Sequence, residues 1–263
     1  MNIRLQMLCV WTGPAMIVGW LASFWPLGGF IPPPNPELTP NEVVARYLAH
    51  TTEIRLALVL SMLASALLVP YSAVISSHLR RVEGPRSPWT TTQVVSAGLL
   101  SGEFIFPIMF WQVAAYRPSY EHADLTRMFN DFGWLTFVGI TSTAAVQFAS
   151  IGVVILFGEG PKVFPRWLGY VNIWVALAVL PGACVPLFKA GPLAWNGVIG
   201  FWLVLVAFTV WMGVMTPMLR RVIVKERDDL ASGHVPADGQ PVRAVEDERG
   251  GVPLDLAGQG EPG

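Results

Sequence analysis

Residues 96–111 read SAGLLSGEFIFPIMFW, an apolar run that contains a single carboxylate, Glu103. A run of this kind can form a helix that is surrounded by hydrocarbon, and comparable runs recur along the chain. Of all residues 53% are hydrophobic and only 13% are charged, whereas soluble domains average about 25% charged residues. The charged residues gather in short connecting segments and near the C-terminus. The sequence therefore predicts an all-α, polytopic membrane protein.

Six stretches of the 263-residue chain are apolar enough to cross about 30 Å of hydrocarbon as helices. We expect these spans at residues 7–30, 54–77, 89–114, 132–157, 166–188 and 194–219. Together they form one transmembrane domain, residues 1–227, built as a bundle of six helices. Residues 228–263 are rich in glycine, proline and acidic side chains and lack apolar periodicity, so we expect a disordered tail.

Basic residues are distributed unequally between the two sets of connecting segments. With the N-terminus inside, ten lysines and arginines fall in inner segments: Arg4, Arg80, Arg81, Arg86, Lys162, Arg166, Arg220, Arg221, Lys225 and Arg227. Five fall in outer segments: Arg46, Arg55, Arg117, Arg127 and Lys189. Because basic residues accumulate on the cytoplasmic side of a membrane protein, we expect both termini in the cytoplasm of a cell-membrane protein.

Local signals predict further features of the connecting segments and of the fifth span. Thr39 and Glu42 have the spacing of a capping box, and apolar residues follow at helical spacing, so a short amphipathic helix is expected on the outer side. Asp124 is placed to cap the helix that leads into the fourth span. Pro181 and Pro186 lack a backbone N–H donor, so the outer end of the fifth span should be broken.

Polar side chains recur at helical spacing in three of the spans. They are Ser61, Ser65, Ser72 and Ser76 in the second span, Thr92, Ser96 and Glu103 in the third, and Thr136, Thr143, Gln147 and Ser150 in the fourth. Because lipid tails offer these groups no hydrogen bonds, the three polar faces should turn toward one another. Gly98 and Gly102 would let another helix approach closely beside Glu103.

Glu103 is the residue that this arrangement has to explain. An acid at the centre of a spanning helix costs about 2.5–3.5 kcal/mol on insertion scales. Burial favours its neutral form, and a hydrogen bond from Ser65, Thr143 or Gln147 would make it tolerable. The functional interpretation is a polar cavity centred on Glu103, whose candidate lining residues are Ser61, Ser65, Ser72, Ser96, Thr136, Thr143 and Gln147.

A structural interpretation stands beside this one. Intramembrane serines and threonines often bond to a carbonyl of their own helix, and a protonated glutamate can simply join two helices. In that case the polar residues contribute to packing and carry no further function.

The sequence gives little support to other kinds of chemistry. We find no phosphate-binding loop, nucleophile elbow or zinc-protease motif, and a net charge of −1 gives no reason to expect nucleic-acid binding. An enzymatic activity therefore has the least support. No cofactor or metal ion is expected, because solvated loops and helix caps account better than a metal site for His50, Glu53, Glu121, His122 and Asp124.

Two segments carry a resemblance to a family. Residues 164–182, FPRWLGYVNIWVALAVLPG, and 188–202, FKAGPLAWNGVIGFW, resemble the C-terminal half of an uncharacterised group of bacterial six-span integral membrane proteins. The resemblance implies a six-helix protein of a bacterial inner membrane and transfers no function or site residue. Within the first segment, Asn172 can bond to a neighbouring carbonyl or line a ligand site.

These observations leave two functional hypotheses. The first is a protein that binds or carries a small amphipathic or apolar molecule, with a proton-linked role for Glu103. Because the chain is small for a solitary transporter and shows no inverted repeat, a carrier would act as a homo-oligomer. The alternative is a non-catalytic subunit that anchors or assembles a larger membrane complex through its tail and its inner arginines.

Overall fold

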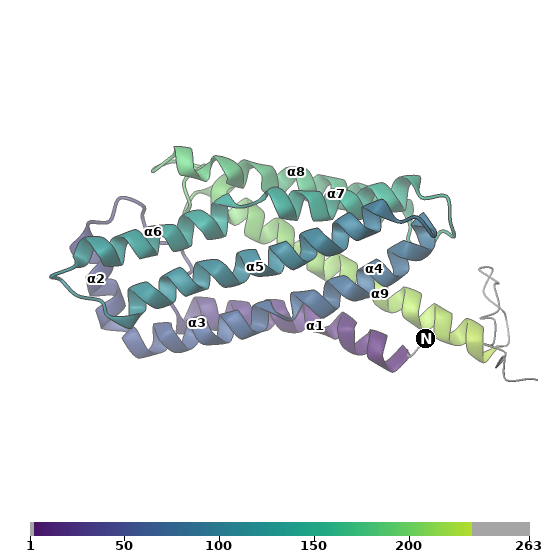
Figure 1. Cartoon of the computed structure of the whole chain (residues 1–263), viewed down its shortest axis with the longest axis horizontal. Helices are drawn as coiled ribbons and strands as arrows, with labels where there is room; N and C mark the ends of the chain where they lie inside the picture. The colour runs from purple at the N-terminus through teal and green to yellow at the C-terminus, as the bar shows by residue number, and fades with distance from the viewer. Residues whose placement is uncertain (1–2, 233–263) are drawn as a thin grey trace, which may run out of the picture.

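The computed structural model describes residues 3–232, and within this range it contains helices and no strand. Six helical segments of this range are long and apolar enough to cross a membrane: Ile3–Leu27, Thr51–Glu83, Pro88–Tyr116, Ala123–Phe157, Arg166–Leu187 and Val198–Ala231. Each segment overlaps one of the six predicted spans, so the all-α, multi-pass membrane bundle is confirmed. Figure 1 shows the six spanning segments lying roughly along one common direction, with the N-terminus and the C-terminal part of the last helix at the same end.

Most spans are built from more than one helical piece. In order they are α1 (Ile3–Ala22) with the π-helical η1 (Ser23–Leu27), α3 (Thr51–Ser65) with α4 (Leu68–Glu83), α5 (Pro88–Tyr116), α6 (Ala123–Gly139) with α7 (Ser142–Phe157), α8 (Arg166–Val179) with the 3₁₀-helical η2 (Leu180–Leu187), and the π-helical η3 (Val198–Leu203) with α9 (Val204–Ala231). Because α9 continues to Ala231, the predicted tail begins later than residue 228. The prediction of disorder for residues 233–263 lies outside the described residues.

Two of the interruptions have a proline as their local cause. α8 gives way to η2 directly before Pro181, which confirms the predicted break of the fifth span. The separation of α3 from α4 was not predicted. Pro70 has no N–H to offer the carbonyl of Ala66, and the N–H of Val69 bonds to that carbonyl instead, at 3.2 Å.

The fourth span is interrupted at its middle. Ile140 adopts an extended conformation with φ −87° and ψ 92°, between the end of α6 at Gly139 and the start of α7. Glycine followed by two β-branched residues is a weak helix-forming sequence, which explains the position of the break. The interruption brings the carbonyl end of α6 and the amide end of α7 to the middle of the span.

The helix α2 (Pro40–Ala49) lies across the end of the bundle opposite the N-terminus (Figure 1). Its predicted capping box is confirmed: the N–H of Glu42 bonds to the Thr39 hydroxyl, and the Thr39 N–H donates to the Glu42 carboxylate at 2.7 Å. Tyr47 is buried, and its hydroxyl donates to Asn130 Oδ1 at 3.1 Å. The predicted amphipathic helix is therefore docked on the bundle through its apolar face.

Two other local predictions are wrong. Asp124 is not the cap of α6, because the helix begins one residue earlier and the carboxylate lies 3.3 Å from the guanidinium of Arg127. Gly98 and Gly102 do not admit a neighbouring helix within this chain. A Cβ atom on Gly98 would meet no atom within 4 Å, and one on Gly102 would meet only a ring of its own helix.

Buried apolar side chains form two clusters, one in each half of the bundle. One cluster joins α1, α4, α7, α8 and α9, and the other joins η1, α2, α3, α6 and the C-terminal part of α5. Trp111 and Trp134 are fully buried in the second cluster, with ring centroids 5.0 Å apart. The candidate site lies where these two clusters meet.

Candidate functional site

A cavity lies at the junction of the two apolar clusters, among residues of the first, third, fourth, fifth and sixth spans. Its aromatic lining residues are Trp20, Phe104, Phe137, Phe148, Phe201 and Phe208. Its volume of about 80 Å³ is smaller than a cavity of about 150 Å³ that holds benzene. Because this small cavity, which we call the slot, is partly open, it can receive part of a molecule that extends beyond it.

Three departures from regular α-helix meet at this slot. Ile140 and Thr141, at the break in the fourth span, line it, as do Gly200 and Phe201 of the π-helical η3. Val179, the last residue of α8 before η2, lines it as well. Interrupted spanning helices near mid-membrane form the binding sites of many transporters, and π-helical turns are frequent at functional sites.

Glu103 brings a carboxyl group from α5 to the edge of the slot. The hydroxyl of Thr143 donates a hydrogen bond to its Oε1, so one of the three predicted donors is confirmed. Its Oε2 is buried and has no hydrogen-bond partner among the described residues. The same is true of the hydroxyl of Thr141, which is 4% exposed.

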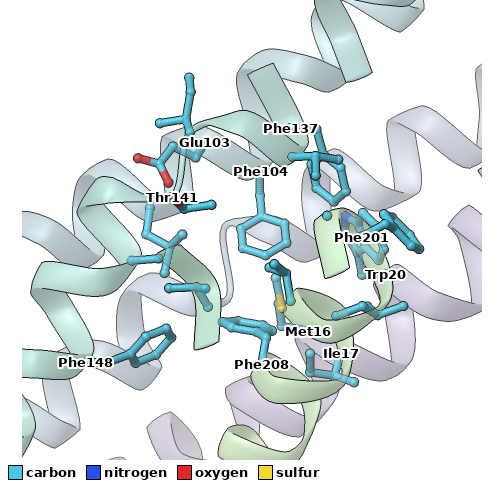
Figure 2. Close-up of a pocket in the computed structure, with 18 of the residues that line it drawn as sticks. Met16, Ile17, Trp20, Glu103, Phe104, Phe137, Thr141, Phe148, Phe201 and Phe208 are labelled. Atoms are coloured by element: carbon cyan, nitrogen blue, oxygen red, sulfur yellow. The ribbon is translucent and has the colours of Figure 1, made fainter. Parts of the chain in front are cut away.

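Figure 2 shows Glu103 and Thr141 next to each other on one side of the cavity, with Trp20 and Phe201 on the other. Glu103 is the only ionisable residue among those that line the cavity. The indole N–H of Trp20 is a buried donor without a partner among the described residues. The slot therefore combines an apolar body with two unpaired oxygens on one side, the acceptor Glu103 Oε2 and the Thr141 hydroxyl, which can donate or accept, and one unpaired donor on the other.

The composition of the cavity differs from the prediction. Glu103 lines it and Thr143 touches it through Glu103, but its other lining residues do not include Ser61, Ser65, Ser72, Ser96, Thr136 or Gln147. The cavity is apolar because the first and sixth spans contribute their aromatic faces to it.

Three of the predicted residues have hydrogen-bond partners away from the cavity, two on their own helix and one on the first span. Ser65 donates to the carbonyl of Ser61 at 2.7 Å, and Ser61 shares a hydrogen bond of 2.9 Å with Ser23 of η1. Thr136 donates to the carbonyl of Phe132 at 2.6 Å. These three hydroxyls therefore fit the structural interpretation, in which the polar residues contribute to packing and carry no further function.

The other three belong to a second polar feature, which we call the polar band and define as Ser72, Ser76, Gln93, Ser96 and Gln147. All five are buried, and they lie on α4, α5 and α7, which pack against one another. The hydroxyl of Ser76 donates to Gln93 Oε1. Ser72 Oγ, Gln93 Nε2 and both amide atoms of Gln147 have no hydrogen-bond partner among the described residues.

The polar faces of the second, third and fourth spans therefore do turn inward. They form a band beside the cavity, not its wall. On α5 the band is separated from Glu103 by two helical turns, and on α7 Gln147 lies one turn from Thr143.

Sequence reasoning missed the aromatic lining of the slot. Trp20, Phe201 and Phe208 lie on spans with few polar residues, and an aromatic side chain that faces lipid cannot be distinguished by type from one that faces a cavity. Thr141 was also missed, although its position two residues after Gly139, at a weak helix-forming sequence, was a usable signal.

Asn172 joins two helices. Its Oδ1 accepts a hydrogen bond from Trp211 Nε1 of α9, and its Nδ2 donates to the carbonyl of Leu168, both at 2.8 Å. Asn172 thus has the packing role among its two predicted alternatives.

Acidic and histidine side chains form no metal centre in the described part of the chain. Within residues 3–232 no group of three or more His, Cys, Asp or Glu side chains is placed to hold a metal ion. The nearest approach to a charged cluster is at the N-terminal end of the bundle, where Glu226 of α9 pairs with Arg81 and lies 3.3 Å from Nδ1 of the buried His78. These contacts tie α9 to α4.

Comparison with known proteins gives no relative from which a function could be transferred. No protein-family model matches the chain, and neither a curated protein nor a solved structure matches it. The functional conclusion therefore depends on the geometry of the bundle and its cavity.

Proposed function

We propose that this integral membrane protein binds or carries a small amphipathic or apolar molecule in the cavity at Glu103. The observation that supports this proposal is a narrow, aromatic-lined slot at mid-span with one carboxyl group, whose Oε2 has no partner among the described residues. Binding pockets for small molecules are mostly apolar and contain a few polar groups that fix the orientation of the ligand. The slot has this composition.

The polar group supplies most of the selectivity. A molecule that enters from the bilayer leaves one apolar environment for another, so the aromatic lining provides shape but little net driving force. A hydrogen bond to Glu103 or Thr141 is different, because such a bond has no counterpart among lipid tails. The ligand should therefore be slender and apolar with at least one hydrogen-bonding group.

The proposal includes a proton-linked role for Glu103. A carboxyl group at this depth can exchange its proton when a ligand approaches or leaves. The polar band supports this role, because Gln147 lies one turn from Thr143 on α7, and on α5 the band continues to Gln93 near the start of that helix, which lies at the N-terminal end of the bundle (Figure 1). We place that end in the cytoplasm, because the basic residues predominate on that side.

Native mass spectrometry of the purified protein tests the proposal. We expect wild-type protein to retain a bound molecule of low mass, and Ala144→Leu, which adds volume at a residue that lines the cavity, to lose it. Ala145→Leu is the matched control, because Ala145 lies on the same helix, is similarly buried and does not line the cavity.

The same measurement distinguishes the two functional hypotheses. Retention of the bound molecule by Ala144→Leu would contradict the proposed site. A partner chain that remains bound to the wild type, with no small molecule in any variant, would favour the alternative of a subunit that assembles a membrane complex.

A further inference from the structure

We infer that the molecule bound in this cavity is an amphipathic amine: a slender alkyl chain that ends in a primary ammonium group. This inference rests on the proposed function and names the class of its ligand. It follows from the charge, the hydrogen-bonding groups and the shape of the slot.

The charge of the lining favours a cation. Among the described residues that line the cavity only Glu103 is ionisable, so none of them supplies a positive charge to its carboxylate when the acid ionises. A cationic ligand supplies the missing opposite charge, whereas an anionic ligand would meet a like charge. The carbonyl end of α6, at Gly139, and the amide end of α7, at Ser142, meet beside the slot, so their opposite partial charges offset each other and the preference for a cation comes from Glu103.

The hydrogen-bonding groups near Glu103 are mainly acceptors. Glu103 Oε2 and the Thr141 hydroxyl oxygen are both buried without a partner among the described residues. Figure 2 places these two side chains next to each other. A primary ammonium group has three donors and no acceptor, so it can bond to both oxygens at once. An alcohol can also reach both groups, because it can donate to Glu103 Oε2 and accept from the Thr141 hydroxyl, but it brings no positive charge to the carboxylate.

The apolar part of the slot fits the rest of such a molecule. The slot is narrow, with a volume of about 80 Å³, and its aromatic side chains come from α1, α5, α6, α7, η3 and α9. A cavity of this volume accommodates part of an alkyl chain more readily than a fused ring system. Aromatic faces also attract cations, which adds to the preference for an ammonium head group.

Binding of an ammonium group to the protonated acid displaces the acid's proton. The carboxyl O–H bond breaks, the carboxylate pairs with the ammonium group, and one proton is released to water for each molecule bound. The buried polar side chains of the polar band on α5 and α7 lie near Glu103 and provide a polar environment for the released proton.

Photolabelling with three matched probes tests this inference. Each probe carries the same ten-carbon chain with a diazirine, and the head groups are primary ammonium, hydroxyl and carboxylate. The protein is placed in phosphatidylcholine nanodiscs at pH 7, where an alkyl ammonium group is charged. The measured quantity is a ratio. Labelling of the cavity peptides from α1 and α9 is divided by labelling of a reference peptide from α8, which contains the exposed residues Trp174 (71%) and Leu177 (51%).

We expect the ammonium probe to label the cavity peptides about tenfold more than the hydroxyl probe, because the hydrogen bond of a charged ammonium group to the carboxylate is the stronger one. The carboxylate probe should not exceed the reference. Glu103→Gln should remove the preference for ammonium, and Thr141→Val should reduce it. Glu53→Gln, which removes an exposed carboxylate in the first turn of α3, should leave it unchanged.

Each contrary outcome overturns a different statement. Equal cavity labelling by all three probes, or a preference for ammonium that survives Glu103→Gln, would contradict the amine ligand and leave the proposed cavity function standing. Cavity labelling at the reference level for every probe would contradict the proposed function itself.

Discussion

Gln147 shows most clearly that this chain keeps polar side chains inside the bundle at a cost in stability. Its side chain is 0% exposed, and neither of its amide atoms has a hydrogen-bond partner among the described residues. A buried polar group without a partner costs about 1–3 kcal/mol. Residues that break a stability rule without a local compensation are frequent at functional sites, which agrees with the position of Gln147 beside the Glu103–Thr143 pair.

Replacement of Gln147 by leucine should therefore stabilise the protein. We expect Gln147→Leu to raise the free energy of unfolding by about 1–2 kcal/mol, because it removes an unpaired buried amide and keeps a similar volume. Unfolding by a denaturing detergent measures the change. Gln112→Leu is the control, since Gln112 donates to the carbonyl of Arg55 at 3.1 Å and its removal should bring no gain. A lower stability for Gln147→Leu would contradict this account.

At the scale of the residue, the sequence predicted the acid and one of its partners, and missed most of its surroundings. Glu103 was identifiable because an ionisable group in an apolar run needs a reason. Thr143 followed from helical spacing and depth. Trp20 and Phe208 did not, because nothing in their residue type distinguishes a cavity wall from a lipid-facing surface, and only the packing of six helices decides between them.

At the scale of the element, lengths and breaks were predictable to different degrees. The spans follow from hydrophobicity and length, and the break before η2 follows from Pro181. The break at Ile140 has no proline to announce it, since it depends on a weak helix-forming sequence that the packed bundle can hold open. That break is the element that brings Thr141 into the cavity.

The capping box of α2 should make the order of that helix depend on pH. The hydroxyl and then the N–H of Thr39 donate to the Glu42 carboxylate and hold its pKa below the usual 4.5. A lowered pKa in the folded state means that the contribution to stability is complete above pH 4.5 and is lost as the pH falls through the lower folded value.

Hydrogen exchange of α2 amides, corrected for intrinsic rates, measures this dependence. Protection in the wild type should decline below about pH 4.5, the unfolded value. Glu42→Gln cannot ionise, so its protection should vary less with pH than that of the wild type. The same decline in both proteins would show that the capping box is not its cause.

At the scale of the whole molecule, the bundle is two apolar halves joined at a slot. Neither half closes the junction completely, because α6 and α7 separate there and η2 and η3 replace regular α-helix. The slot therefore results from the way the spans are interrupted as much as from the residues that line it. This level of organisation could not be read from the sequence, in which each span appears as a single apolar run.

α5 and α7 meet at Glu103 in the interior of the bundle. Cysteine cross-linking in native membranes measures this contact. In a background with Cys9→Ser and Cys184→Ser, the pair Glu103→Cys and Thr143→Cys is treated with an ethylene-bridged bis-methanethiosulfonate reagent. The chain is then cleaved at a protease site inserted at residues 118–120. The comparison pair is Ser101→Cys with Thr143→Cys, because Ser101 faces α3, where it donates to the carbonyl of Ser65 at 3.2 Å. We expect the fragments to stay joined for positions 103 and 143 and to separate for 101 and 143. Separated fragments for 103 and 143 would contradict the contact between Glu103 and Thr143.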